Sequence, residues 1–154
     1  MRLDKLTLKT QETLTESMRL ATDGGHPEIA PLHFLMALLT QDQGAVPSIL
    51  QRIGIQATTI RENAAERLTR LPRVSGESIP TPALGVTAQR TLKAAWKIAD
   101  QLKDEYLSTD HLLLGLLKSG DNETTTILAE VGVQEADVLT ALKAVRGNQR
   151  VTDP

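Results

Sequence analysis

The sequence contains no cysteine, only three aromatic residues and no long run of apolar residues. Without cysteine the chain has neither disulfides nor thiolate chemistry. The aromatic residues, Phe34, Trp96 and Tyr106, are too few to form the stacking platform of a single-strand nucleic-acid binder. The longest apolar run, from Phe34 to Leu39, is far shorter than the ~18 residues that a membrane-spanning helix needs. We therefore expect no nucleic acid and no membrane among its partners.

Charge of one sign is not in excess either. The chain has 17 basic and 19 acidic residues and a net charge of −2, which gives no basic footprint for nucleic acid. Met1 is followed by Arg2, Asp4 and Lys5 rather than by the apolar stretch of a secretory signal. Together with the lack of cysteine, this start predicts a cytoplasmic protein. What is present, 154 residues of which 40% are hydrophobic, suffices for one globular domain that folds without disulfides.

The sequence contains an internal repeat. At an offset of 78 residues, with no gap, 13 of the 63 positions from Leu6 to Leu68 are identical to the residue 78 further on. About three or four identities are expected by chance at ordinary residue frequencies. The identical pairs include His33 with His111. We infer a duplication and refer to the two halves as the first and second repeats.

Each repeat is predicted to form helices and no sheet. Leu14, Met18 and Ala21 recur at the spacing of one helical face, which predicts a first helix. A second helix begins at Pro31 in the first repeat and at Ser108 in the second, where the serine hydroxyl can cap free amides. This second helix is apolar on all sides in both repeats, so a central position is expected.

A short third helix and a fourth helix follow in each repeat. The third is predicted over residues 48–53 and 126–131, each ending at a glycine that can adopt the left-handed conformation. The fourth should turn one apolar face inward, with the residues Ile60, Ala64 and Leu68 in the first repeat and Val138, Leu142 and Val145 in the second. The predicted fold class is therefore all-α, with two tandem four-helix repeats.

Two segments lie outside the predicted helices. Residues 72–82 hold three prolines, two serines and one glycine, a composition typical of a linker. Residues 147–154 are polar and lack apolar spacing, so we interpret them as the start of a flexible linker to a further module. The expected organisation is a domain over residues 1–146, with the first repeat at about 1–71, the linker at 72–82 and the second repeat at about 83–146.

The residues do not assemble into a recognisable catalytic or metal site. His33 and His111 occupy equivalent positions in the first turn of the second helices, but no cysteine or clustered third ligand accompanies them. A structural role is therefore favoured over a metal-binding or acid–base role. A phosphate-binding loop is missing, and the acidic pair Glu62 and Glu66 is typical of a solvated helix face. We predict a binding domain rather than an enzyme, with no catalytic, cofactor or metal residues.

An acidic cluster surrounds the link between the first two helices of the second repeat. Its members are Asp100, Asp104, Glu105 and Asp110, with Tyr106 and Leu107 among them. Such a run is usually a solvated surface. The alternative is an acidic rim on an apolar groove, which would suit peptides that carry lysine or arginine beside apolar residues.

Four stretches are distinctive when taken together: MRLDKLT at residues 1–7, PLHF at 31–34, RLPRV at 70–74, and VRG at 145–147 leading into RVT at 150–152. They resemble the N-terminal domain of the ClpB family, whose full-length members are hexameric AAA+ disaggregase chaperones. The resemblance covers essentially the whole chain. It implies an all-helical Clp N-terminal domain whose two four-helix repeats are related by a pseudo-twofold axis and packed as one globular unit.

The resemblance also implies a function. In this family the domain contacts unfolded or aggregated polypeptide and helps to deliver it to the ring, which threads it under ATP in cooperation with the DnaK chaperone system. No cofactor is implied for this domain, because ATP belongs to the missing AAA+ modules, and a monomeric isolated domain of a hexameric full-length protein is expected. The substrate-binding positions that match are Thr7, Asp104 and Asp110, beside an apolar groove that would include Leu92 and Tyr106.

A second similar family is the N-terminal domain of ClpC, an unfoldase that feeds a protease and binds adaptors or phosphoarginine. Its pattern places a carboxylate immediately before the histidine of each repeat. Asp110 before His111 fits this pattern, but Leu32 before His33 does not, and an apolar side chain cannot pair with a guanidinium. Adaptor docking is therefore the alternative function.

Overall fold

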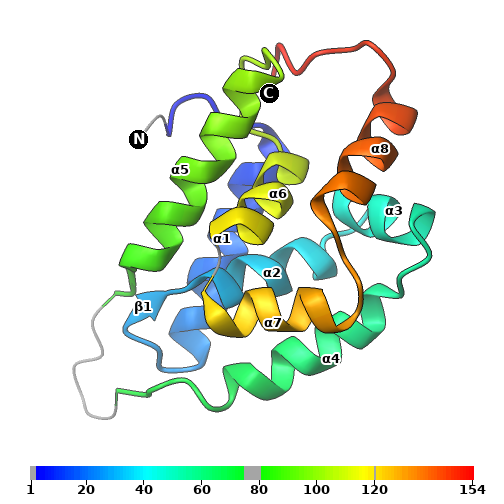
Figure 1. Ribbon diagram of the computed structural model, residues 1–154. Helices are drawn as coiled ribbons and strands as arrows, with labels where there is room; N and C mark the ends of the chain where they lie inside the picture. The colour runs from blue at the N-terminus through cyan, green and yellow to red at the C-terminus, as the bar shows by residue number, and fades with distance from the viewer. Residues whose placement is uncertain (1–2, 75–80, 120) are drawn as a thin grey trace.

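The computed structural model describes residues 3–74, 81–119 and 121–154, and most of this part of the chain is helical (Figure 1). This confirms the all-α class. The elements in chain order are α1 (Leu8–Asp23), β1 (Glu28–Ile29), α2 (Pro31–Thr40), α3 (Ala45–Arg52), α4 (Ala57–Leu68), β2 (Ala83–Leu84), α5 (Val86–Gln101), α6 (Thr109–Ser119), α7 (Asn122–Glu130) and α8 (Glu135–Arg146). Helices α1 to α4 form the first repeat and α5 to α8 form the second.

The two repeats fold in the same register. Helix α5 starts and ends 78 residues after α1, and α8 starts and ends 78 residues after α4. The turn after the first helix uses a left-handed residue at equivalent positions, Gly25 with φ 70° and Lys103 with φ 60°. Glycines follow the third helices with φ 81° at Gly54 and 82° at Gly132, as predicted. The duplication is therefore visible in the backbone as well as in the residues.

Extended segments are exchanged between the repeats. Leu6, which precedes α1, pairs in parallel with Leu107, which precedes α6. Its equivalent Leu84, which precedes α5, pairs in parallel with Ile29, which precedes α2. The start of each repeat thus lies beside the interhelix loop of the other, which is the exchange that a twofold axis produces.

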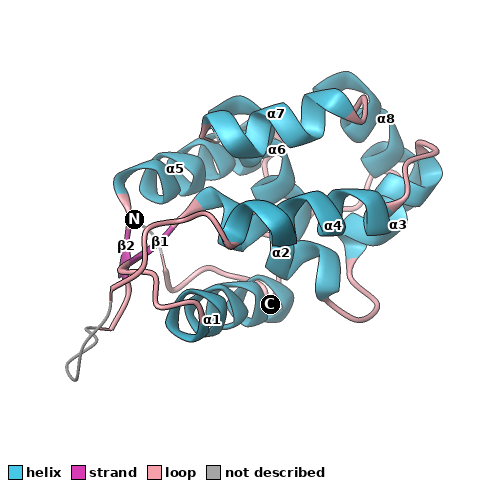
Figure 2. Cartoon of the chain, turned by 90° about the horizontal axis from the view of Figure 1, so that it is seen from below, coloured by secondary structure: helices cyan, strands magenta, loops and turns pink. Residues whose placement is uncertain are grey.

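One small sheet departs from the sequence prediction. The pair of Ile29 and Leu84 extends by one residue into the ladder of β1 and β2, which lie side by side at one end of the molecule (Figure 2). A ladder of two residues leaves no alternating pattern in the sequence, because contact between the repeats rather than local propensity creates it.

The core lies where α2 and α6 meet, as predicted for helices without a polar face, and both helices stand in the middle of the bundle in Figure 1. Every residue from Pro31 to Leu39 is buried. On α6, Leu112 to Leu114 and Leu116 are fully inaccessible. Gly115 allows α6 to approach α5 closely, because a Cβ atom there would stand 2.7 Å from the main-chain oxygen of Thr91.

Several local details differ from the prediction. Helix α7 starts at Asn122, earlier than predicted, because the Asp121 side chain accepts the Thr124 amide and caps the helix there. Helix α3 likewise starts earlier, at Ala45. Val145 was predicted to face inward but is 53% exposed, because Arg146 in the same last turn of α8 takes the inward direction.

The linker predicted over residues 72–82 is described only at its ends, since residues 75–80 lie outside the described part of the chain. Before this stretch, the Val74 amide donates to the Gly25 oxygen at 2.7 Å, and after it Ala83 begins β2. Within the described residues, no helix combines the length and the apolar character needed to cross a bilayer.

Candidate functional site

The loops between the first and second helices of each repeat carry equivalent hydrogen-bond networks. In the first repeat, His33 Nδ1 accepts the Ala30 amide at 2.8 Å, and its Nε2 lies 2.8 Å from Nδ1 of His26. In the second repeat, His111 Nδ1 accepts the Ser108 amide at 2.9 Å. Because Nδ1 of each helix histidine is an acceptor, the ring proton lies on Nε2 and is donated to the loop residue. These contacts give both histidines a structural role.

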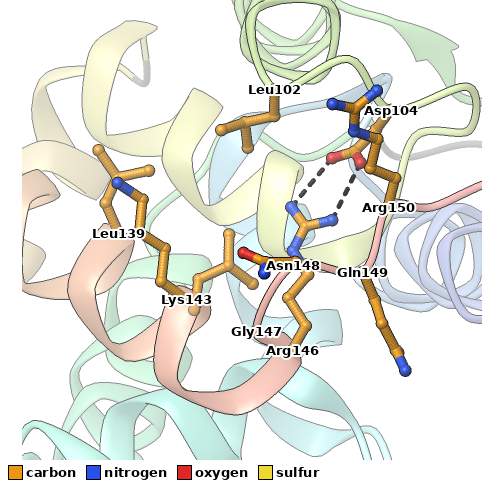
Figure 3. Close-up of a pocket in the computed structure, with 10 residues that line it drawn as sticks. Leu102, Asp104, Leu139, Lys143, Arg146, Gly147, Asn148, Gln149 and Arg150 are labelled. Carbon is orange, nitrogen blue, oxygen red and sulfur yellow. Dashed lines mark hydrogen bonds and ion pairs between the residues drawn. The ribbon is translucent and has the colours of Figure 1, made fainter.

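The loop residue itself differs between the repeats. Asp104 occupies the position equivalent to His26, and its Oδ2 atom lies 2.7 Å from Nε2 of His111. Arg146 at the end of α8 binds both oxygens of Asp104, at 3.0 and 2.9 Å, as the dashed lines in Figure 3 show. A bidentate arginine–carboxylate pair is among the strongest polar contacts in proteins. The second repeat therefore holds a buried ionic cluster where the first holds two histidines.

Asp110 belongs to the same cluster. Its Oδ2 atom lies 3.7 Å from Arg146, and its Oδ1 atom accepts the His111 amide at 3.1 Å and contacts the Ser108 hydroxyl. The Ser108 hydroxyl thus binds the Asp110 carboxylate rather than capping amides as predicted, because the longer aspartate side chain reaches the helix amide itself. The side chains of Asp104 and Asp110 are 0% and 6% exposed, so they form a buried network and not a solvated acidic rim.

The pKa values of His26 and His33 in the first repeat and of Asp104 in the second are all lowered, but for different reasons. Desolvation lowers the pKa of His33 to about 4, with a contribution from the neighbouring His26 ring, and desolvation also lowers the pKa of His26. Burial alone would raise the pKa of Asp104. The Arg146 guanidinium, the Val151 amide and the His111 ring outweigh it, and the net pKa of Asp104 lies below its usual value.

The histidine pair predicts a loss of stability in mild acid. The unfolded chain, with a His33 pKa near 6.5, binds more protons than the folded chain between about pH 6.5 and about pH 4. The free energy of unfolding should therefore fall as the pH drops through this window, by up to about 3 kcal/mol for His33. Urea denaturation at a series of pH values between about 7.5 and 4.5 measures this directly.

A matched variant tests the cause of that pH dependence. His26→Asp places the carboxylate of the second repeat beside His33, where it favours the imidazolium form and should remove much of the loss between about pH 6.5 and 4. A parent chain with constant stability across this window, or an unchanged slope in the variant, would contradict the account.

The C-terminal segment, residues 147–154, passes back over the second loop. The Val151 amide donates to Asp104 Oδ1 at 2.9 Å. The Val151 oxygen accepts the amides of Glu105 and Tyr106 at 2.7 and 3.3 Å. Three residues later, the Pro154 oxygen accepts the Leu8 amide at 3.0 Å. An extended segment thus lies along the surface formed by the start of α1 and the α5–α6 loop.

The structure brings four of the five predicted site residues to this region. Thr7 caps α1 through its side chain, and its main-chain amide donates to the Leu107 oxygen at 3.1 Å. Half-buried Tyr106 lies under the Lys5 ammonium group, 5.1 Å from the ring centre. Asp104 and Asp110 lie in the ionic cluster beneath. Leu92 is 1% exposed and belongs to the hydrophobic core, so it supports this region from inside and does not line its surface.

Three residues of this region were not singled out from the sequence. Arg146 neutralises both aspartates, Leu8 is a 61% exposed apolar side chain next to Thr7, and Val151 supplies the main-chain partners of the loop. Leu8 could have been noticed in the sequence, since it is an apolar residue in the otherwise polar first turn of α1. The pairing of Arg146 with Asp104 spans 42 residues and has no local signature.

A pocket of about 310 Å³ opens beside the ionic cluster, between α8, the C-terminal segment and the α5–α6 loop (Figure 3). Its wall combines apolar and basic side chains, among them Leu102, Leu139, Lys143 and Arg150. Across the described residues, histidine, aspartate and glutamate do not gather in a group of three that could hold a metal ion. The arrangement therefore offers main-chain hydrogen bonds, an apolar side chain and a charged wall for a polypeptide.

Comparison with known proteins agrees with this fold. The sequence matches the family described as Clp repeat (R) N-terminal domain over residues 5–131. The chaperone protein ClpB of Rhodopirellula baltica is 38% identical over 153 residues, which cover 99% of this chain but 17% of that protein. The chain thus spans about a sixth of the length of the curated relatives it matches.

Solved structures resemble the fold over most of its length. The N-terminal domain of Hsp104 from Candida albicans has a TM-score of 0.82 at 24% identity, covering 97% of this chain and 96% of that chain. A ClpV N-domain in complex with a VipB peptide has a TM-score of 0.68 at 18% identity, covering 90% of this chain and 86% of that chain.

Proposed function

Because this chain belongs to the Clp N-terminal repeat domain family, we propose that it is the substrate-binding domain of a ClpB-type disaggregase and captures unfolded or aggregated polypeptide. In this proposal the domain delivers clients to a hexameric ATPase ring that works with the DnaK chaperone system. The domain itself carries out no chemistry and needs no cofactor, while ATP is consumed by AAA+ modules elsewhere in the full-length protein.

One observation carries the proposal at the level of residues. The surface between the start of α1 and the α5–α6 loop binds an extended polypeptide, here residues 150–154, chiefly through main-chain atoms. Main-chain recognition does not depend on the sequence of the bound segment, which suits a receptor for many different clients. The exposed Leu8 and the half-buried Tyr106 add apolar contact next to these hydrogen bonds.

Weak binding is expected at a single site. An apolar contact of ~300 Å² at ~25 cal/mol per Å² contributes about 7 kcal/mol, while association costs at least ~4 kcal/mol. About 3 kcal/mol remains, so the dissociation constant of one domain should be no tighter than low millimolar. Several domains linked in one ring would recover affinity through effective concentration, and each contact could still release its client.

A matched pair of variants tests the location of the surface. Leu8 and Val86 are equivalent in the two repeats and equally exposed, at 61% and 62%, but only Leu8 lies beside the α5–α6 loop. Leu8→Ser should weaken binding of a fluorescently labelled, permanently unfolded protein about fivefold, because it removes apolar contact. Val86→Ser should leave the affinity unchanged. Equal effects of the two substitutions, measured by fluorescence anisotropy, would contradict the assignment.

Adaptor docking is the second candidate function, and a domain of the same fold, the ClpV N-domain, has been seen in complex with a VipB peptide. It predicts one folded partner bound at sub-micromolar strength, which a pull-down would reveal. A phosphoarginine site of the ClpC type finds less support. The Asp110 carboxylate is already engaged by the domain's own Arg146, and Leu32 at the equivalent position of the first repeat is fully buried.

A further inference from the structure

The surface proposed to bind clients is already occupied by the chain itself. Val151 uses both of its main-chain groups there, as a donor to Asp104 and as an acceptor from Glu105 and Tyr106, while the Pro154 oxygen accepts the first amide of α1. We propose that residues 150–154 are an internal competitor, which an extended client segment must displace before it binds the same donors. This inference rests on the proposed function and adds to it a state in which residues 150–154 cover the client-binding surface.

The bound segment is held in a way that permits exchange. Arg150, Thr152, Asp153 and Pro154 are exposed, and Val151 is only half-buried. The segment is therefore attached by main-chain hydrogen bonds with little apolar anchoring. Because any extended polypeptide can offer the same main-chain groups, a client can replace these bonds one for one.

Departure of the segment does not leave a buried charge unpaired. When the Val151 amide leaves, Asp104 still keeps both bonds from Arg146 and its contact with His111. The cost that normally opposes the opening of a buried carboxylate site is therefore small. The ionic cluster holds the loop in its binding conformation whether the segment is bound or free.

The first repeat shows that this arrangement is particular to the second loop. There the chain leaving α4 also passes over the equivalent loop, but Val74 and Arg73 donate to the oxygens of Gly25 and Gly24. The loop acts as an acceptor in that contact. In the second repeat, the loop amides of Glu105 and Tyr106 act as donors to the segment. These two adjacent amides converge on the single oxygen of Val151, so another polypeptide that presents a main-chain carbonyl at this point can take its place.

A pair of proline variants of the whole chain tests the competition. Val151→Pro removes the amide that binds Asp104, whereas Thr152→Pro changes an amide that makes no hydrogen bond in the described residues. The probe is fluorescently labelled α-lactalbumin that has been reduced and carboxymethylated so that it stays unfolded. Val151→Pro should bind this probe about fivefold more tightly than the parent chain, because the fraction of molecules with a free surface rises. Thr152→Pro should bind it as the parent does.

The outcomes separate this inference from the proposed function. Hydrogen exchange at the Glu105 and Tyr106 amides should be faster in Val151→Pro, which verifies that the segment has been released. A chain ending at Asn148 should bind the probe at least as tightly as Val151→Pro. If the parent binds and both released chains bind no more tightly, the competition is refuted while the proposed function stands. If neither the parent nor a released chain binds, both are refuted.

Discussion

Replacing Arg146 with leucine is expected to lower the free energy of unfolding by about 3 to 5 kcal/mol. Arg146 holds both oxygens of Asp104, whose side chain is completely buried, and also lies 3.7 Å from Asp110. The variant leaves two buried carboxylates without their cation, and the loss of a partner from a buried ion pair is costly because the remaining charge stays desolvated. Urea denaturation monitored by circular dichroism measures the change.

The first repeat provides the matched control for Arg146. The residues equivalent to Asp104 and Arg146 are His26 and Leu68, so the first repeat has the His26–His33 contact and an apolar side chain in place of the ion pair. The double variant Asp104→His with Arg146→Leu copies that pair into the second repeat and should recover at least half of the stability lost in Arg146→Leu alone. A single variant as stable as the parent would show that the ion pair contributes nothing. A double variant less stable than the single would show that the repeats are not interchangeable at this position.

Truncation of a single buried leucine side chain on either central helix is expected to lower the free energy of unfolding by a similar amount. Leu38 on α2 and Leu116 on α6 are equivalent residues, and both are 0% exposed. Leu38→Ala and Leu116→Ala should each lower the free energy of unfolding by about 2 to 5 kcal/mol, because each removes buried apolar groups and leaves a cavity. For a domain of ordinary stability this is a large share of the total, so the melting temperature should fall clearly in both variants.

Val145→Ala is the control for these truncations. Val145 is 53% exposed on α8, although its spacing in the sequence had predicted an inward position. Its substitution should change the free energy of unfolding by no more than about 0.5 kcal/mol. A loss at Val145 comparable with that at Leu116 would mean that the last turn of α8 is packed differently from the structure described above.

Most of the fold could be predicted because the sequence repeats itself. The 78-residue offset indicates the register before any helix is assigned, and the uninterrupted apolar stretch around Leu35 and Leu113 can only be accommodated in a core. Pro31 and Gly54 mark a helix start and a helix end through their own backbone preferences. These signals are local, so a single sequence contains them.

The candidate site was harder to predict because its contacts are not local. From the sequence, Asp104 and Asp110 were expected to lie on a solvated surface or on the acidic rim of an apolar groove. In the structure they are buried and paired with Arg146, which is distant in the sequence. Leu92 was placed in a groove through a resemblance, whereas its equivalent in the first repeat, Leu14, belongs to the predicted apolar helix face and so indicates a core position. The return of the C-terminal segment depends on main-chain bonds at Val151, and such bonds leave no trace in the type of residue.

The central claim is that the surface between the start of α1 and the α5–α6 loop receives unfolded polypeptide. Titration of the isotope-labelled chain with reduced, carboxymethylated α-lactalbumin, followed by amide chemical shifts, tests it most directly. The account predicts shifts concentrated at Thr7, Leu8, Glu105, Tyr106 and Val151, with the equivalent loop around Glu28 unaffected. Shifts spread evenly over the domain, or confined to α3 and α4, would contradict it.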